Sequence, residues 1–533
     1  MVNRGPFHPG DLLDVTVVLR VCDHAETVLA CVDSLLEQTT GKLRLEIIAV
    51  DDGSTDDSGP LLARAADRSG GVLRIGRQQR GLSPAAARNL GLSQARGRFV
   101  IFLEGADRLA PDALARMVAV ADKTEADVVL GKPESSGRHA VATSMFRTGR
   151  EYADLYASRV YWSLTPDKLF RTSMLERRGL QFPTDVLIGD DQAFTAAAYV
   201  AADNIAVVAD RTCIIKGPSS APSVPLPERV ALAARMMALV TTLVPAGPRL
   251  DLLLSRHLES ELGRATGALL LASDHQAERQ QAMWSAQSVL RTHLTPGALA
   301  RLPRPLAVRL ALLSAGRFPE AEQMAVYEAE KPPAPRKTVE DGRVFTTLPY
   351  FRDPQVPLDD DLFDITDRMT VTHELTRLQW TGPMLTLDGF AFFEQLSTRD
   401  RATKVVLRHR ESGAEERFSV TARRDETLLN SKGKPRAMAR FSARVGLGQT
   451  SSGWPVAPGI WDISLAVSFE GVTREVRLGR RRSADVDTTA RPPVVIAPSP
   501  RSEQHELVAA PFYTPEGDLS IEVAERRPLP GAR

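Results

Sequence analysis

The chain has 533 residues, of which 43% are hydrophobic and 25% charged, a composition that excludes a disordered, collagen-like or fibrous protein. Because domains usually run roughly 100 to 200 residues, this length predicts about three or four folding units. Lys and Arg total 67 against 66 Asp and Glu, so the formal net charge of +1 gives no global field that would attract nucleic acid, and we expect no nucleic-acid partner.

The first third of the chain alternates short apolar runs with helical patterns. Runs typical of buried strands span residues 15–22, 45–50, 72–75 and 98–103. Between the first two, residues 25–39 place Val28, Cys31, Val32 and Leu35 on one helical face. This alternation predicts a parallel, Rossmann-like α/β sheet covered by helices. Ligands of such sheets bind at the carboxyl ends of the strands, which here are the loops at 20–24, 51–55 and 104–107.

Changes in composition divide the chain into four parts. A stretch rich in Pro and Ser over 215–227 follows the α/β pattern, and residues 228–325 carry helical patterns without strand signals. Residues 328–342 combine Pro with both charges, the composition of a semi-rigid linker. We therefore predict an α/β domain at 1–220, a helical linker domain at 221–327, a linker at 328–344 and a β region at 345–533.

Short alternating runs fill the last third of the chain and are separated by Gly, Pro, Asn and Ser turns. This pattern predicts an antiparallel β-sandwich, which we expect to be immunoglobulin-like. Near the C-terminus, residues 512–523 indicate a hairpin whose turn is Glu516-Gly517-Asp518.

Two carboxylates, Asp51 and Asp52, stand at the predicted carboxyl end of a strand and are followed by Gly53, Ser54 and Thr55. This pattern suits a nucleotide-binding loop. Taken alone, it suits an ordinary turn with a helix cap at least as well. The choice between the two depends on the motifs that follow.

Those motifs run in a fixed order within residues 14–216. They read GLS at 81–83, ARNLGL at 87–92, an acidic strand end at 104–107, DKLFR at 167–171 and IGDDQ at 188–192. Together with the DDGSTD loop, the series resembles the family 2 glycosyltransferases, nucleotide-sugar enzymes with the GT-A fold. The resemblance implies a GT-A-like catalytic domain and an inverting hexosyltransferase activity.

The resemblance also assigns roles to single positions. It implies that Asp52 approaches the nucleobase, that Arg88 faces the nucleotide, and that Glu104 lies near the ribose and diphosphate. Asp191, beside Asp190, would be the base that takes the proton of the acceptor hydroxyl. A second interpretation of this acidic pair is a helix cap with a first-turn acid, which suits the helix dipole. We favour the catalytic interpretation.

The metal motif of the family, usually Asp-x-Asp, is altered here to Glu104-Gly105-Ala106 and is followed by Asp107. The resemblance implies a divalent cation, Mn or Mg, for which Glu104 and Asp107 are the carboxylates at hand. The usual ligand position is Ala106, however, and no histidine lies near Lys216. The altered motif argues against metal dependence, and we expect no organic cofactor.

Basic residues offer a second way to bind a diphosphate. Arg20 stands at the end of the first predicted strand, Arg80 precedes the GLS motif, and Lys216 lies at the end of the α/β pattern. One hypothesis is that they supply the positive charge that a metal would give. The other is that they are solvated surface residues beside a degenerate site. With Asp23 and Asp51, they complete the predicted nucleotide-sugar site.

The three-part layout is similar to that of the bacterial glycosyltransferases that decorate wall teichoic acid, a poly(ribitol phosphate), with N-acetylglucosamine. This similarity implies transfer of a hexose or N-acetylhexosamine from a UDP-linked donor to a cell-envelope polymer such as teichoic acid or a polysaccharide, and a homotrimer formed through the β region. The rival interpretation is a catalytically decayed fold that binds nucleotide-sugars or glycans as a scaffold. Ala106 supports the rival, whereas Asp52, Arg88 and Asp191 together oppose it.

Three cysteines, Cys22, Cys31 and Cys213, cannot form a disulfide framework and predict a reducing compartment. No run reaches the ~18 apolar residues that a membrane helix needs, and the N-terminus lacks the apolar core of a secretory signal. We expect a cytoplasmic protein without signal peptide or transmembrane helix. The apolar segment 301–318 carries arginines and could lie on the inner face of a membrane, although we favour a packed helix with exposed arginines.

Overall fold

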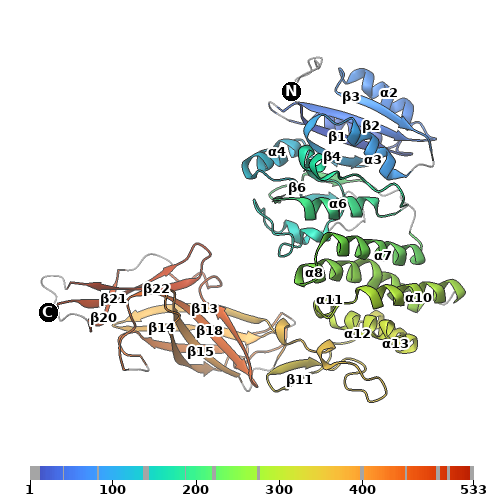
Figure 1. The fold of residues 1–533 in the computed structure, drawn as a ribbon. Coiled ribbons are helices and arrows are strands. Elements are labelled where there is room, and N and C mark those ends of the chain that lie inside the picture. Colours follow the sequence, from blue (N-terminus) through green and yellow to red (C-terminus); the bar gives the residue numbers. More distant parts are fainter. Residues whose placement is uncertain are drawn as a thin grey trace. The chain divides into compact units, whose positions relative to one another are not determined.

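The computed structural model divides into two compact units, Met1–Lys331 and Pro332–Arg533 (Figure 1). The described residues are 13–39, 41, 43–80, 83–135, 143–186, 188–218, 224–272, 276–396, 401–431, 433–450, 453–487, 492–500 and 504–527. Gly81 and Leu82 of the GLS motif lie outside them. Each unit has its own sheet and its own hydrophobic core.

A seven-stranded sheet forms the centre of the first unit, in the order β3-β2-β1-β4-β8-β6-β9 (Figure 1). Its strands are β1 Leu13–Val21, β2 Leu45–Asp52, β3 Leu73–Gln78, β4 Gly97–Glu104, β6 Val128–Gly131, β8 Leu169–Arg171 and β9 Ile205–Val208. Strands β1 to β4 pair in parallel, whereas β8 is antiparallel to both β4 and β6. The predicted α/β sheet is confirmed, and β1 to β4 lie where the apolar runs placed them.

Helices cover this sheet and complete the α/β pattern. They are α1 Val28–Leu36, α2 Ser58–Arg68, α3 Pro84–Ser93, α4 Ala113–Thr124, α5 Thr172–Arg178 and α6 Asp190–Ala201. The predicted apolar face of α1 is confirmed, because Val28, Cys31, Val32 and Leu35 are all buried in the core against the strands. A small second sheet joins β5 Arg108–Leu109, β10 Ile214–Lys216 and β7 Pro133–Ser135 in that order.

Four buried phenylalanines hold helix α6 against the sheet. Phe102 of β4 and Phe170 of β8 meet Phe194 of α6 with ring centroids 5.6 and 5.3 Å apart. Phe182, in the segment before α6, stacks on Phe194 at 3.9 Å. T-shaped and stacked aromatic contacts of this kind add to the free energy of apolar burial. The cluster therefore fixes the helix whose first residue is Asp190.

Helices α7 to α13 follow within the same unit (Figure 1). They are α7 Leu226–Leu243, α8 Pro248–His257, α9 Gly263–Leu271, α10 Gln276–His293, α11 Pro296–Arg301, α12 Arg304–Ser314 and α13 Phe318–Glu330. A π-helical turn at Leu258–Leu262 joins α8 to α9. The predicted helical linker domain is confirmed as an all-helical segment, while its exact boundaries stay predictions.

Most of the segment at 301–318 forms α12, a packed helix rather than a surface helix. Our expectation that its arginines are exposed is wrong for Arg309, which is 3% exposed. Its guanidinium pairs with Glu328 at 2.7 Å and donates to the Thr266 hydroxyl at 2.8 Å. A charged group can be buried when its donors are satisfied in this way. Within the described ranges, no helix has both the length and the apolar character needed to cross a membrane.

The second unit is an antiparallel β structure. Its short first sheet pairs β11 Lys337–Glu340 with β12 Arg343–Thr346, so part of the segment expected to be a linker is a strand. The larger sheet follows the order β13-β14-β17-β16-β15-β18-β22-β21-β20, with β19 paired to β18. Its strands are β13 Val371–Thr381, β14 Met384–Phe393, β15 Arg401–His409, β16 Glu415–Arg423, β17 Arg440–Gly446, β18 Gly459–Phe469, β19 Val472–Arg477, β20 Val494–Pro498, β21 Glu506–Tyr513 and β22 Leu519–Arg526.

The predicted C-terminal hairpin is confirmed, because β21 pairs with β22 across the turn that contains Glu516-Gly517-Asp518. Gly517 has φ +89, a left-handed conformation that glycine adopts without strain. Apolar side chains from strands of both ends of this sheet share one core, which includes Leu387, Leu465 and Ile521. The antiparallel β region is confirmed, and its immunoglobulin-like character stays a prediction.

The aromatic cluster generates a stability prediction. Phe194→Ala should lower the free energy of unfolding of the first unit by about 3 to 5 kcal/mol, because it removes a fully buried ring and leaves a cavity among three others. Chemical denaturation measures this loss. Trp284→Ala, at a side chain that is 55% exposed, is the control and should change stability by about 0.5 kcal/mol or less. Equal effects of the two substitutions would show that α6 is not held by this cluster.

Candidate active site

Charged side chains gather where the central strands of the first unit end. Arg20 lies near the carboxyl end of β1, Asp52 ends β2 and Glu104 ends β4. These strands are neighbours in the order β2-β1-β4, and Arg20 and Glu104 are register partners. Arg88 on α3 and Asp190 at the start of α6 approach the same edge. The edge is the one at which parallel sheets bind their ligands.

Five of these side chains form one continuous charge ladder, Asp52–Arg20–Glu104–Arg88–Asp190. Arg20 donates from Nε to Asp52 Oδ2 at 2.7 Å and from Nη1 to Glu104 Oε2 at 2.9 Å. Arg88 donates from Nη2 to Glu104 Oε1 at 2.7 Å and from Nη1 to Asp190 Oδ2 at 2.5 Å. Each oxygen of Glu104 therefore accepts a hydrogen bond from a different arginine, and each arginine bonds two carboxylates.

The charge ladder is largely withdrawn from solvent. The side chains of Asp52, Asp190 and Arg88 are 4%, 7% and 10% exposed. Burial alone would raise the pKa of Glu104, but the ion pairs with Arg88 and Arg20 outweigh it and hold that pKa below its ordinary value. The pKa of Arg88 is raised in turn, because its carboxylate partners outweigh the cost of burial. Glu104 and Arg88 therefore both stay charged at neutral pH.

A second group of contacts joins the loops after β1 and β2. Asp23 accepts from the Thr55 backbone N–H at 2.7 Å and pairs with Arg80 at 3.1 Å. Arg80 also donates to the Thr55 hydroxyl at 3.0 Å. Gly53, at φ +69, has no room for a side chain, because a Cβ there would lie 2.5 Å from the Arg80 backbone. These predicted site residues are thus brought together, at the exposed rim of the strand ends.

Asp51 lies deeper and is held within its own loop. It is buried, accepts from the Ser54 backbone N–H at 2.9 Å, and pairs with Arg77 at 3.0 Å. This arrangement is that of a turn-stabilising carboxylate. Asp52, its neighbour, instead faces Arg20 and also accepts from the side-chain amide of Gln78. The two acids of the loop therefore differ in what their side chains contact.

Asp191 likewise differs from Asp190 in what its side chain contacts. Its carboxylate is half-buried and accepts one hydrogen bond, from the backbone N–H of Gln192 at 2.8 Å. Burial, which outweighs the nearby charge of Arg88, raises the pKa of Asp191 to about 6. Within the described part of the chain its second oxygen accepts no hydrogen bond. Asp191 is therefore a carboxylate poised to take a proton near neutral pH.

The residues at the end of β4 do not suit a divalent cation. Ala106 offers no side-chain ligand, and both oxygens of Glu104 are taken by arginines. The Asp107 carboxylate faces the end of β10. It accepts hydrogen bonds there from Lys216 Nζ at 2.6 Å and from the Gly217 backbone N–H at 3.2 Å. Metal ligands in proteins gather as clusters of oxygen, nitrogen or sulfur donors, and no group of three or more His, Cys, Asp or Glu residues with that geometry occurs in the described residues.

Two contributors were missed at the level of sequence. Asp167, quoted only as part of the DKLFR motif, pairs with Lys216 at 3.3 Å and links it to the motif. Gln192 receives a hydrogen bond at 3.3 Å from Arg256 on α8, a contact between the α/β part and the helical segment. The DKLFR motif could have indicated Asp167. No sequence signal indicated Arg256, because the two partners are 64 residues apart.

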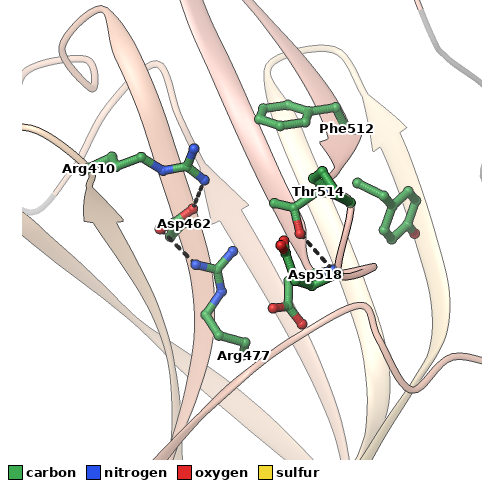
Figure 2. Close-up of a pocket in the computed structure, with 9 residues that line it drawn as sticks. Arg410, Asp462, Arg477, Phe512, Thr514 and Asp518 are labelled. Carbon is green, nitrogen blue, oxygen red and sulfur yellow. Dashed lines mark hydrogen bonds and ion pairs between the residues drawn. The ribbon is translucent and has the colours of Figure 1, made fainter. Parts of the chain in front are cut away.

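The second unit has a pocket of about 560 Å³ at the turn of the C-terminal hairpin. Figure 2 shows that Arg410 and Arg477 both point at Asp462, while Thr514 and Asp518 lie on the turn. The two arginines pair with Asp462 at 2.7 Å each. Both arginines of the lining are thus already paired with its Asp462.

Comparison with known proteins assigns three segments of the chain to known families. Residues 16–179 match the family described as glycosyl transferase family 2. These residues form a family 2 glycosyltransferase domain. Residues 229–325 match the glycosyl transferase TarS linker domain, and residues 364–523 match the TarS beta-glycosyltransferase C-terminal domain 1. The resemblance predicted from the motifs is confirmed, and so is the assignment as a glycosyltransferase.

One curated relative and two solved structures match larger parts of the chain. A poly(ribitol-phosphate) beta-glucosyltransferase of Bacillus spizizenii is 25% identical over 485 residues, which are 89% of this chain and 73% of the relative. The crystal structure of Staphylococcus aureus TarS aligns with a TM-score of 0.56 at 19% identity, covering 96% of this chain and 86% of that one. A structure of S. aureus TarS 1–349 with UDP-GlcNAc has a TM-score of 0.56 at 21% identity, covering 65% of this chain and 98% of that one. These structural likenesses show the shared fold.

The charge ladder predicts a large effect of removing its central arginine. Arg88→Met should lower the free energy of unfolding by about 3 to 5 kcal/mol, because Glu104 and Asp190 each lose a buried ionic partner. The control is Arg98→Met, whose partners Asp14 and Asp122 are reached from a side chain that is 41% exposed, and it should cost roughly 0 to 1 kcal/mol. Urea denaturation of both variants compares them. A loss below that of the control would mean that the ladder does not support the fold.

Proposed function

We propose that this family 2 glycosyltransferase is an inverting enzyme that moves a hexose or N-acetylhexosamine from a UDP-sugar to a hydroxyl of a polyol-phosphate polymer of the cell envelope. One observation carries the proposal. Asp191 stands at the strand-end site with a pKa of about 6, next to an aspartate whose charge is already held by Arg88. A single available base suits direct displacement at an anomeric carbon.

The proposed step uses one carboxylate. The acceptor hydroxyl oxygen attacks the anomeric carbon of the donor sugar, and Asp191 takes the hydroxyl proton. A new C–O bond forms as the bond between the anomeric carbon and the diphosphate oxygen breaks, and the electron pair leaves with UDP. Since the diphosphate departs as an anion, no second carboxylic acid is needed to protonate it, in contrast to glycoside hydrolysis.

The donor would lie across the loops that follow β1, β2 and β4. We assign Arg20, Asp23, Asp51, Asp52, Arg80, Arg88, Glu104 and Lys216 to the nucleotide-sugar site and Asp190 to the support of Asp191. Within this set, Asp51 and Asp190 act indirectly, because their carboxylates are held by neighbouring groups. Glu104 and Asp107 remain the two carboxylates that a bound Mn or Mg ion would use. Their ion pairs favour a donor site that works without such an ion.

The names of the relatives support the choice of substrate. The B. spizizenii relative is named for transfer of glucose to poly(ribitol phosphate), and the TarS fragment was solved with UDP-GlcNAc. We extend these substrates to this chain because it matches the family 2 domain and the two domains named after TarS. The cytoplasmic location, contact with a membrane face, a trimer formed through the β region and the domain boundaries stay predictions.

A scaffold that has lost catalysis is the less favoured alternative. A protein without catalytic activity would not need to retain this acidic pair. Here Asp190 is bound to Arg88, and the pKa of Asp191 is raised. On either side of Ala106, the carboxylates of Glu104 and Asp107 form ion pairs with basic side chains, so their negative charges are compensated. These features indicate a maintained site.

The base assignment predicts that Asp191→Asn abolishes turnover without abolishing binding. Turnover of UDP-glucose or UDP-GlcNAc with poly(ribitol phosphate) should fall about 10²- to 10⁴-fold, because the amide cannot accept the proton. The affinity for UDP, measured by calorimetry, should stay within about twofold. Asp112→Asn, at the N-cap of α4, is the control at another helix N-terminus and should leave turnover unchanged. Binding of UDP-sugars by the unaltered protein without any turnover would favour the scaffold, whereas full turnover by Asp191→Asn would show that Asp191 is not the base.

The raised pKa of Asp191 predicts the acidic limb of the pH profile. Asp191 must be ionised to accept a proton, so activity should be complete above about pH 7 and should fall as the pH drops through about 6. Below that point kcat/KM should decrease about tenfold per pH unit. Initial rates between pH 4.5 and 8, with UDP affinity measured in the same buffers, provide the test. A midpoint near pH 4 would mean that an unshifted carboxylate, not Asp191, is the base.

A further inference from the structure

The turn after β4 touches the strand that carries Lys216. Strand β10 pairs with β5, which places Ile215 opposite Arg108 directly after the turn. Gly217 is so close to the turn that a Cβ there would lie 2.0 Å from the carbonyl oxygen of Ala106. The segment containing Lys216 therefore packs against the position where the family's metal ligand is replaced by alanine.

The ammonium group of Lys216 is fixed in this place by two carboxylates. Its Nζ lies 2.6 Å from Asp107 Oδ2 and 3.3 Å from Asp167 Oδ2. Burial would lower the pKa of Lys216, but the two ion pairs outweigh it, so the group stays charged. The side chain is still 25% exposed. A ligand oxygen can thus reach a positive charge whose position is set in advance.

The two departures from the family's metal motif both make the turn after β4 more positive. Alanine at 106 removes a negative charge from the turn, and Lys216 brings a positive charge beside it. Arg20 and Arg88 belong to the charge ladder, and Arg80 is tied to Asp23 at the rim. Lys216 is paired as well, but its partner Asp107 directly follows Ala106, so its charge lies beside the altered metal motif.

We propose that Lys216 takes the place of the divalent cation, and that its ammonium group binds the diphosphate of the nucleotide-sugar donor. This inference rests on the proposed function and adds to it that the donor binds without a metal ion. A preorganised cation beside the leaving diphosphate stabilises the charge that develops there during transfer. Lys216 acts on the diphosphate alone and not on the nucleoside.

Calorimetry on EDTA-treated protein tests this with UDP and with uridine, which lacks the diphosphate. The unaltered protein should bind UDP in EDTA, and added Mn²⁺ or Mg²⁺ should change the affinity by less than about twofold. Lys216→Met should weaken UDP binding about 10- to 100-fold, the range expected for a lost charge-assisted hydrogen bond, and leave uridine binding unchanged. Lys216→Arg should retain most of the UDP affinity. Lys123→Met, at a lysine whose side chain is 66% exposed, is the control.

A second variant restores metal ligands instead of removing the cation. Ala106→Asp combined with Lys216→His should bind UDP weakly in EDTA and regain affinity on addition of Mn²⁺. UDP binding by the unaltered protein only in the presence of Mn²⁺ or Mg²⁺ would overturn this inference while leaving the proposed function intact. Equal UDP affinity of Lys216→Met and the unaltered protein would overturn it too. Failure to bind UDP or UDP-sugars with or without metal would overturn the proposed function, and this inference with it.

Discussion

The site depends on one arrangement, the alternation of negative and positive side chains from Asp52 to Asp190 across the ends of three strands and two helices. Buried ions are costly to remove from water, and their cost is offset here because each arginine lies between two carboxylates. Every member comes from a different element. The ladder therefore forms only when β2, β1 and β4 are neighbours in the sheet and α3 and α6 both reach its edge.

The same arrangement separates the roles of two adjacent acids. Arg88 forms its ion pair with Asp190, and successive helical residues point about 100° apart, so the Asp191 carboxylate takes another direction. The pKa of Asp191 rises because burial outweighs the attraction of Arg88, and Asp191 forms no ion pair within the described ranges. A pair of chemically identical side chains thereby gains one structural member and one member able to move a proton, through environment alone.

The sequence predicted the elements well, because strand runs and the buried face of α1 are local patterns. It also indicated the acids of the site, since they follow strands or begin a helix. It could not show their partners. Arg20 meets Glu104 over 84 residues and Lys216 meets Asp107 over 109, and neither hypothesis for these cations, nucleotide contact or solvated surface, included such ion pairs. Arg309 was misjudged for the same reason, because its buried acceptors lie on other helices.

The helical segment after the α/β part contributes to the site as well. Gly189 precedes α6 at φ +88, and a Cβ there would lie 2.2 Å from Leu232 of α7. Arg256 of α8, which pairs with Glu261 of the π-helical turn, donates to Gln192 next to the base. Both contacts act on the first turn of α6, where a shift of a fraction of an ångström would change the direction of the Asp191 carboxylate. The helical segment is therefore part of the structure that positions the base, and a catalytic fragment that ends before α7 would lose a support that the strand ends do not replace.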